Sequence, residues 1–316
     1  MRRLPVPMNQ PLVTIVTPCY NSAQFIEDTI QSVLAQTYPN IEYIVMDGGS
    51  TDGTQAIAER YADRLTLISE RDRGQTHAIN KGWQRAKGDI LAWLNADDLY
   101  YPDTVEKAVS YLTTHPEIGW VYGYGDSLDI NGQPMPFRHP VYAWDYQKLL
   151  NRGCYIVQPT VFLRREVFEQ NGLLTEELHY CMDYEYWLRI GKRCPAALVP
   201  EIRAGVKIFR ATKSRSGGYK RIVEIEAMLR HYGASDLPAP MQHEWTMAAL
   251  SEGMHQLRAG RWGQVRKMLA QAGRYPRTLP RAVTKLLFNA VVPPSLETKI
   301  RQTWIRAEKA SQGQMS

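Results

Sequence analysis

Two adjacent carboxylates, Asp97 and Asp98, follow a short apolar run, residues 89–94, that predicts a buried strand. Neighbouring acids destabilise each other in a buried place unless a cation or several hydrogen-bond donors offset their charge. Magnesium and manganese prefer oxygen ligands, and they commonly bind one or two carboxylates together with water and substrate phosphates. The pair therefore indicates a divalent-metal site. A helix cap with a solvated neighbour is an equally open interpretation.

A third acid, Asp47, ends another apolar run and begins the segment Asp47-Gly-Gly-Ser-Thr-Asp-Gly-Thr54. The glycines permit close approach of a ligand to the backbone, and the hydroxyls can cap the next helix. Asp47 could accept hydrogen bonds from a nucleobase or a ribose. A simple turn with an Asx cap is the alternative. The segment matches neither the G-x-G-x-x-G nor the G-x-x-x-x-G-K-[ST] pattern, which disfavours a dinucleotide site and a P-loop.

A fourth acid, Asp183, lies where a helix is expected to begin, with Tyr186, Trp187 and Ile190 on its packing side. Asp183 is interpreted either as a helix cap or as a general base. The second role requires this segment to fold over the same crevice as the other acids. The seven histidines show no metal-ligand spacing, and no G-x-S-x-G nucleophile motif is present.

These acids depend on the elements that position them. Strands are expected over residues 13–17, 42–46, 65–69 and 89–94, alternating with helices that follow Ser22 as N-cap, Thr54, Thr76 and Pro102. Such alternation predicts an α/β fold with a mainly parallel sheet covered by helices on both faces. The carboxyl ends of parallel strands open onto one crevice, where ligands bind. Asn131-Gly132 further predicts a hairpin turn.

The length of 316 residues and the 44% hydrophobic content suffice for a full core. We expect one large domain over residues 1–232, a linker over 233–242 and a helical extension over 243–316. The four cysteines lie far apart and form no metal or disulfide pattern, which favours a reducing cytosol. Neither a secretory signal nor a membrane-spanning run is expected.

Positive charge is concentrated in the C-terminal part of the chain. Residues 255–316 contain 12 Lys and Arg but only 2 Asp and Glu, which gives this part a net charge of +10. Because the whole chain has a net charge of +6, residues 1–254 have a net charge of −4. Basic residues mixed with apolar ones are typical of helices on an anionic membrane surface. A packing module with a solvated basic face is weighed equally. Nucleic acid is not expected as a partner, because no recognised binding motif accompanies the charge.

Five segments in order make the chain resemble the family 2 glycosyltransferases, which are inverting enzymes of the GT-A fold. The resemblance covers roughly residues 12–216 and is carried by Thr17–Asn21, Met46–Thr54, Arg73–Gly82, Asn95–Asp98 and Met182–Arg189. It implies transfer of a sugar from a nucleotide-diphosphate donor, with a UDP-sugar expected, to a saccharide or lipid-linked saccharide. It also implies a role in cell-surface polysaccharide or glycolipid synthesis, in the cytoplasm or at the inner face of the plasma membrane.

The resemblance also implies roles for individual residues. Asp183 would be the general base, and Asp97 would hold Mn²⁺ or Mg²⁺ on the diphosphate. The nucleotide-sugar would be bound by Thr17, Pro18, Tyr20, Asp47, Arg73, Gln75, Asn95, Ala96 and Asp97. Asp98, Arg210 and Thr212 are further candidates for phosphate or metal contacts.

Three positions depart from the family pattern. Asn95 is a neutral residue at the first D-x-D position, Gly48 replaces a second carboxylate after Asp47, and Thr212 stands where relatives often carry a histidine. Two alternative functions stay in view. A sugar-nucleotide nucleotidyltransferase would need a glycine-rich, basic triphosphate loop, which is not seen. A non-catalytic nucleotide-sugar-binding module would bind the donor without turnover.

Overall fold

The computed structural model describes residues 10–209 and 212–284. The chain divides into two compact units. The first contains the residues up to Gly217 together with Glu224–Asp236, and the second contains Gly218–Val223 and the chain from Leu237 onward. The division falls inside helix α9 (Gly218–His231). Helix α10 (Ala239–Arg258) begins within the stretch predicted to be a linker.

The first unit is built on one mixed sheet in the order β3-β2-β1-β4-β8-β6-β9-β5, with β7 paired to β6. Strands β1 (Val13–Cys19), β2 (Ile41–Asp47), β3 (Thr66–Ser69) and β4 (Ile90–Trp93) are parallel neighbours, as expected. The remainder departs from a mainly parallel sheet, because β8 (Phe162–Arg164) runs antiparallel to both of its neighbours, β4 and β6 (Trp120–Leu128). Strand β9 (Ala196–Lys207) is parallel to β6 and antiparallel to the short β5 (Leu99–Tyr100).

The predicted hairpin is confirmed. Strand β6 pairs with β7 (Pro134–Arg138), and the Gly132 amide donates to the Asp129 carbonyl in a turn where Gly132 has a φ of +78°. Left-handed backbone of this kind favours glycine. The predicted cap at Ser22 is wrong, because α1 begins only at Ile26 and the Ser22 hydroxyl donates to the Tyr20 carbonyl.

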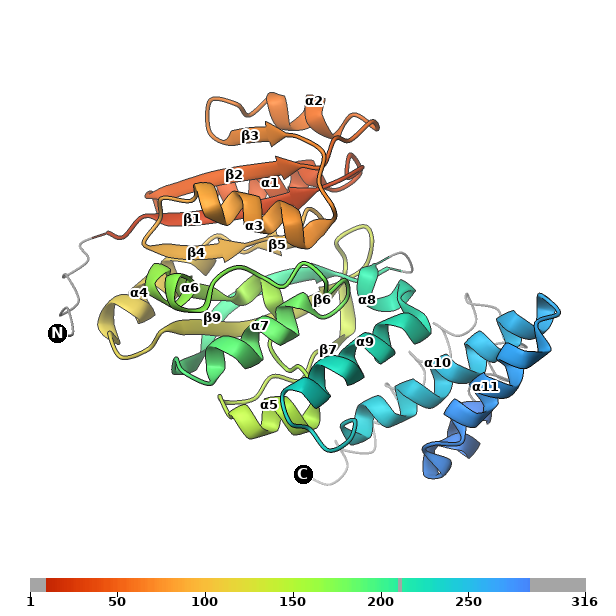
Figure 1. The fold of residues 1–316 in the computed structure, drawn as a ribbon. Helices are drawn as coiled ribbons and strands as arrows, with labels where there is room; N and C mark the ends of the chain where they lie inside the picture. The colour runs from red at the N-terminus through yellow and green to blue at the C-terminus, as the bar shows by residue number, and fades with distance from the viewer. Residues whose placement is uncertain (1–9, 210–211, 285–316) are drawn as a thin grey trace, which may run out of the picture. The chain divides into compact units, whose positions relative to one another are not determined.

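Helices cover both faces of the sheet. On one face, α1 (Ile26–Leu34) and α4 (Thr104–Thr114) share a buried apolar core with Val13 and Ile15 of β1. Helices α3 (Gln75–Arg85), α6 (Arg165–Asn171) and α7 (Met182–Gly191) lie on the face turned to the viewer in Figure 1. Helix α3 approaches β1 closely: a side chain at Gly82 would place its Cβ 2.5 Å from Val16. The remaining short helices are α2 (Thr54–Glu59), α5 (Tyr146–Arg152) and α8 (Lys213–Ser216).

Stacked indoles fix α7 against the sheet. Trp187 of α7 stacks on Trp93 of β4 at 5.4 Å between ring centroids and on Trp120 of β6 at 5.5 Å. All three side chains are buried. Aromatic stacking of this kind adds to the large area that each ring buries. Because Asp183 lies one helical turn before Trp187, this packing positions the amino-terminal end of α7.

In the second unit, α10 packs against α11 (Trp262–Ala272). Val265, Met268 and Ala272 of α11 are buried, and the Trp245 indole of α10 donates to the Gln271 carbonyl at 2.9 Å. No helix within the described residues is both long and apolar enough to cross a membrane.

Candidate active site

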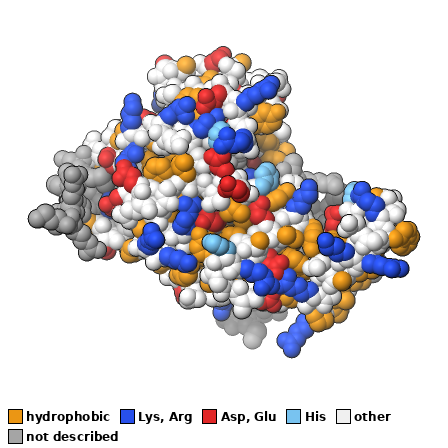
Figure 2. Space-filling view, in the orientation of Figure 1, with side chains coloured by type: hydrophobic (Ala, Val, Ile, Leu, Met, Phe, Trp, Pro, Cys, Tyr) orange, Lys and Arg blue, Asp and Glu red, His pale blue; other side chains and the backbone are white. Residues whose placement is uncertain are grey.

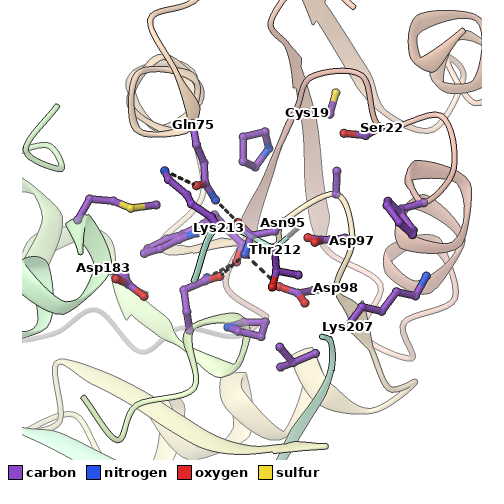
Figure 3. A pocket seen from close by; sticks show the side chains of 18 of the residues that line it. Cys19, Ser22, Gln75, Asn95, Asp97, Asp98, Asp183, Lys207, Thr212 and Lys213 are labelled. Atoms are coloured by element: carbon purple, nitrogen blue, oxygen red, sulfur yellow. Dashed lines mark hydrogen bonds between the residues drawn. The ribbon is translucent and has the colours of Figure 1, made fainter. Parts of the chain in front are cut away.

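A pocket of about 670 Å³ opens at the carboxyl ends of the parallel strands (Figure 3). Volumes of this order are typical of sites for nucleotide-sized ligands. Its walls come from the loop after β1, the start of α3, the loop after β4, residues 154–159, the start of α7, residues 206–209 and residues 212–213. The crevice expected from strand polarity is therefore present.

The structure brings most of the predicted site residues to this pocket. Those that line it are Pro18, Tyr20, Gln75, Asn95, Ala96, Asp97, Asp98, Asp183 and Thr212. Thr17, Asp47 and Arg73 are not among the lining residues. Arg210 lies outside the described residues.

Asp47 is fully buried and its carboxylate is occupied by the protein itself. It accepts hydrogen bonds from the hydroxyls of Ser50 and Ser69, at 2.5 and 2.6 Å, and from the backbone amides of Gly49 and Ser50. These donors offset the charge and leave it no exposed face. Asp47 thus organises the loop after β2 and is not among the residues that line the pocket.

Thr17 and Arg73 are placed away from the pocket for different reasons. Thr17 is buried, with its hydroxyl 3.1 Å from the Tyr43 hydroxyl. Side chains alternate across a strand, so Thr17 and its lining neighbour Pro18 face opposite sides of β1. Arg73 is exposed and forms an ion pair with Glu176 at 2.5 Å.

Asp72 is a lining carboxylate that the motif comparison did not single out. It accepts a hydrogen bond from the Gly74 amide at 2.8 Å. A side chain at Gly48 would place its Cβ 2.6 Å from the Asp72 carboxylate. The missing second carboxylate of the Asp47 motif is therefore explained: Asp72 occupies the space over Gly48.

Asn95 is the hub of a hydrogen-bond network at the pocket wall (Figure 3). Its carbonyl oxygen accepts from Gln75 Nε2 at 2.6 Å, and its amide donates to Asp98 and to Gln158 Oε1, both at 3.0 Å. An aspartate could not donate either of these bonds and would add a carboxylate beside Asp98. The neutral residue at this D-x-D position is thus required by its neighbours.

The two acids after β4 differ in their surroundings. Burial raises the pKa of Asp98 well above its usual range, and the charge of Asp97 raises it further. Burial also raises the pKa of Asp97, while the Lys207 ammonium opposes that change. Among the described side chains, none donates a hydrogen bond to Asp97, whereas Asp98 accepts one from Asn95. Of the two acids, Asp97 is therefore the one whose charge no described side-chain hydrogen bond offsets.

The residues present fit a hard divalent cation that is shared with a substrate. Within the described residues, no three His, Cys, Asp or Glu side chains gather closely enough to bind a metal by themselves. Asp97 supplies one oxygen-donor side chain inside the pocket, and cations such as Mg²⁺ are often held by one or two carboxylates plus substrate phosphates. The residues of this pocket fit a cation that is bound by one protein carboxylate and by the phosphates of a substrate.

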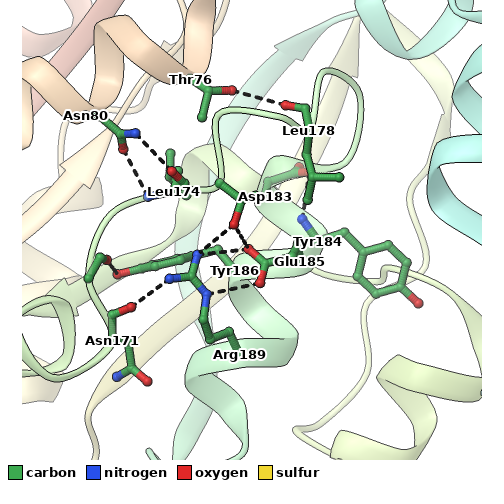
Figure 4. A network of polar contacts seen from close by, with 12 residues as sticks. Thr76, Asn80, Asn171, Leu174, Leu178, Asp183, Tyr184, Glu185, Tyr186 and Arg189 are labelled. Atoms are coloured by element: carbon green, nitrogen blue, oxygen red, sulfur yellow. Dashed lines mark hydrogen bonds and ion pairs between the residues drawn. The ribbon is translucent and has the colours of Figure 1, made fainter. Parts of the chain in front are cut away.

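Asp183 lies in the first turn of α7, and its own carboxylate accepts the Tyr184 amide at 2.7 Å. The preceding loop is fastened at two places. Asn80 of α3 exchanges two hydrogen bonds with the Leu174 backbone, at 2.9 and 3.0 Å (Figure 4), and the Glu224 carboxylate accepts the amides of residues 179–181. Within α7, Arg189 pairs with Glu185 at 2.9 Å. The fold-back of Asp183 onto the pocket is thus built from residues distant in sequence.

Several lining residues were not anticipated from the sequence. They are His139, Cys154, Gln158, Lys207 and Lys213. Lys213 follows Thr212 directly, so the departure at Thr212 was the one sequence signal that pointed toward it. Gln158 and Cys154 lie in the stretch after the hairpin, which has no motif.

A sheet of this topology with an acidic pocket at its carboxyl edge defines the GT-A class of glycosyltransferase folds. The model of the family described as Glycosyl transferase family 2 matches residues 14–172. The chain therefore belongs to glycosyl transferase family 2, as the sequence motifs predicted.

Relatives in sequence support this assignment. An uncharacterised glycosyltransferase of Rickettsia typhi is 34% identical over 57% of this chain and 58% of its own length. The chain thus spans less than two thirds of that relative. TuaG of Bacillus subtilis, a glycosyltransferase assigned to teichuronic acid biosynthesis, is 39% identical over 58% of this chain and 73% of its own.

Solved structures show the same fold. The mannosyltransferase PcManGT from Pyrobaculum calidifontis, in complex with GDP-Man and Mn²⁺, has a TM-score of 0.57 at 21% identity and covers 96% of this chain and 82% of its own. TarS of S. aureus, residues 1–349 in complex with UDP-GlcNAc, has a TM-score of 0.56 at 17% identity, with 84% and 92% covered.

Proposed function

We propose that the protein is an inverting glycosyltransferase that moves a sugar from a nucleotide-diphosphate donor to an acceptor hydroxyl. The observation that carries this proposal is that Asp97 and Asp183 line one pocket. Asp97 is suited to hold a metal ion on the diphosphate, and Asp183 is suited to accept a proton. A single displacement requires both functions within one ligand's length.

In the proposed reaction, Asp183 accepts the proton of the acceptor hydroxyl as that oxygen bonds to the anomeric carbon of the donor sugar. The bond between this carbon and the terminal phosphate oxygen breaks, and its electron pair leaves with the nucleoside diphosphate. Attack from the face opposite the leaving group inverts the anomeric centre. General-base help of this kind contributes about 10²–10⁴-fold to a rate.

Asp97 is the residue that we expect to hold Mn²⁺ or Mg²⁺. When bound, such a cation neutralises charge on the diphosphate. Asn95 and Asp98, which lie on either side of Asp97 in the loop after β4, are tied into the network that includes Gln75 and Gln158. We propose that Pro18, Tyr20 and Asp72 contact the nucleoside, and the support is that they line the pocket beyond the ends of β1 and β3.

The similar proteins support a nucleotide-sugar as donor. Structural neighbours were solved with GDP-Man, UDP and UDP-GlcNAc, and a sequence relative is assigned to teichuronic acid biosynthesis. We propose a UDP-sugar as donor and a saccharide or lipid-linked saccharide in cell-surface polysaccharide or glycolipid synthesis as acceptor.

The proposed function is tested by incubating the protein with UDP- and GDP-sugars, a panel of saccharide acceptors and Mn²⁺, and measuring release of the nucleoside diphosphate. We expect turnover in the wild type and a loss of about 10²–10⁴-fold in Asp183→Asn with donor binding retained. Glu177→Gln, in the loop before α7, is the matched control. Equal turnover in Asp183→Asn and wild type would remove Asp183 as the base, and release of pyrophosphate from nucleoside triphosphates would favour a nucleotidyltransferase.

We further propose that the second unit lies on the inner face of an anionic membrane. Trp262, Leu269, Met254 and Leu257 are exposed large apolar side chains of α10 and α11, and Figure 2 shows hydrophobic and basic side chains next to one another over these helices. Residues 254–284 contain seven Arg and Lys and no acid. An amphipathic, basic surface of this kind suits anionic lipid.

Vesicle co-sedimentation tests this placement with the full chain. We expect binding to vesicles that contain phosphatidylglycerol but not to pure phosphatidylcholine, and a loss of binding in the double variant Trp262→Ser, Leu269→Ser. Val223→Ser, which changes another exposed apolar residue outside α10 and α11, is the control. Unchanged sedimentation of the double variant would exclude α11 as the contact.

A further inference from the structure

Two lysines line the pocket, and their partners differ. The Lys207 side chain is 2% exposed, and its ammonium lies 3.0 Å from the Asp28 carboxylate. Lys207 is therefore already paired by the protein. Lys213 begins α8 directly after Thr212 and is half-buried, with its ammonium donating to Gln75 Oε1 at 3.0 Å.

The Lys213 ammonium has more donors than the protein uses. It carries three N–H groups, and among the described residues Gln75 is its one hydrogen-bond acceptor. No described carboxylate lies within ion-pair distance of it. Burial lowers the pKa of Lys213, while the Asp183 and Glu224 carboxylates oppose that change. A cation in these surroundings is stabilised by an anion that brings its own oxygens into the pocket.

A chain of hydrogen bonds connects Lys213 to the acids after β4 (Figure 3). Lys213 donates to Gln75, Gln75 donates to Asn95, and Asn95 donates to Asp98. Each amide in this chain is oriented by its neighbours, so the ammonium and the acidic pair are held in a fixed relation. The pocket therefore presents a positive group on one side and a carboxylate suited to a metal on the other.

We propose that Lys213 binds the terminal phosphate of the nucleotide-diphosphate donor through its two remaining N–H groups. This inference rests on the proposed function and adds a residue to it. Lys213 and Asp183 line the same pocket (Figure 3), and the proposed function has Asp183 facing the anomeric carbon, so we assign to Lys213 the phosphate next to that carbon. The ammonium opposes the charge that gathers on this phosphate as its bond to the sugar breaks.

The inference also explains the departure at Thr212. Thr212 is one of the three positions at which the sequence departs from the pattern of the family that it resembles. In this chain the positive group is supplied one residue later, on a longer side chain that Gln75 steers into the pocket.

The test is isothermal titration calorimetry of the full chain with UDP and UMP, and with GDP and GMP in parallel. Lys213→Gln should bind the diphosphate about ten- to a hundredfold more weakly than the wild type, because a hydrogen bond to a charged group is lost. Its affinity for the monophosphate should be unchanged. Lys213→Arg should keep most of the diphosphate affinity, and Lys107→Gln on the exposed face of α4 is the control.

Two results would overturn the inference. An equal loss of affinity for monophosphate and diphosphate in Lys213→Gln would mean that Lys213 only shapes the pocket. No loss for either ligand would mean that Lys213 does not touch phosphate. If the wild type binds neither UDP nor GDP, the proposed function itself is wrong, and so is this inference. The two failures are distinguishable, because only the failure of the proposed function abolishes diphosphate binding by the wild type.

Discussion

Two acidic strand ends lie at the same edge of the sheet and differ in their surroundings. At the end of β2, Asp47 is surrounded by hydroxyl and amide donors from its own loop and from β3, and it is fully buried. After β4, Asp97 faces the pocket without a hydrogen bond from any described side chain, and burial raises its pKa. The same residue type is satisfied by the protein at the first strand end and lacks a described side-chain donor at the second.

The comparison teaches that the supply of donors decides the role of a buried acid. Ser50 of the loop after β2 and Ser69 of β3 donate hydroxyl hydrogen bonds to Asp47, so its charge is offset before any ligand arrives. The loop after β4 provides Asn95, whose single donating amide serves Asp98 and Gln158 instead of Asp97. A carboxylate that its own loop leaves unsatisfied is the one to test for function.

The largest effect should come from Asp97→Asn. We expect turnover to fall by about 10³-fold, because electrostatic stabilisation of the leaving diphosphate is removed. The free energy of unfolding should stay the same or rise, since a buried charge is lost. Initial rates with Mn²⁺ and urea unfolding measure the two quantities. A large loss of stability would instead place Asp97 in the same structural role as Asp47.

Asp47→Ala should give the reverse result. We expect the free energy of unfolding to fall by about 3 kcal/mol, because buried amide and hydroxyl donors lose a charged acceptor. Urea unfolding measures the change, with Asp63→Ala at an exposed position of the same unit as control. If Asp47→Ala is as stable as wild type but binds nucleotide weakly, Asp47 contacts the nucleoside after all.

Asn95→Asp would make the two strand ends more alike by adding an acid after β4. The donors to Asp98 and Gln158 are lost and a third carboxylate is added, so the free energy of unfolding should fall by about 2 kcal/mol. Mn²⁺ should restore part of the lost stability of this variant, and it should stabilise the variant more than it stabilises the wild type. Thermal unfolding with and without Mn²⁺ measures this, with Asn151→Asp on the exposed face of α5 as the control. Unchanged stability without metal would show that the Asn95 network is dispensable.

The smallest effect is expected from Gly48→Ala, at the residue that directly follows Asp47. The new methyl would approach the Asp72 carboxylate to 2.6 Å, and a flexible side chain can move away at little cost. We expect stability to change by less than about 1 kcal/mol and nucleotide affinity to fall a few-fold, as one hydrogen bond is misplaced. Titration calorimetry with UDP and GDP measures the change, and Gly263→Ala, which has open space around it in α11, is the control. If Gly48→Ala binds UDP and GDP as tightly as the wild type does, Asp72 has no role in nucleotide binding.

Sequence patterns alone determined the elements that carry the site. The β-branched runs at Val13 and at Ile41 and the apolar run before Asn95 predicted three parallel strands, because side chains buried on both faces must be continuously apolar. Strand polarity then predicted that Tyr20, Asp97 and other polar residues would meet at one edge. Family motifs added Asp183, whose fold-back no local pattern could establish.

Only the tertiary structure decided which acids face the pocket. Asp47 and Asp97 both end apolar strands, and local sequence cannot distinguish them, because the donors that satisfy Asp47 include Ser69, which is 22 residues away. Likewise, Lys213 reaches the pocket through Gln75, a partner 138 residues distant. Hydrogen bonds between segments far apart in the chain fix the exposure and the charge balance of each group, and those quantities determine its chemistry.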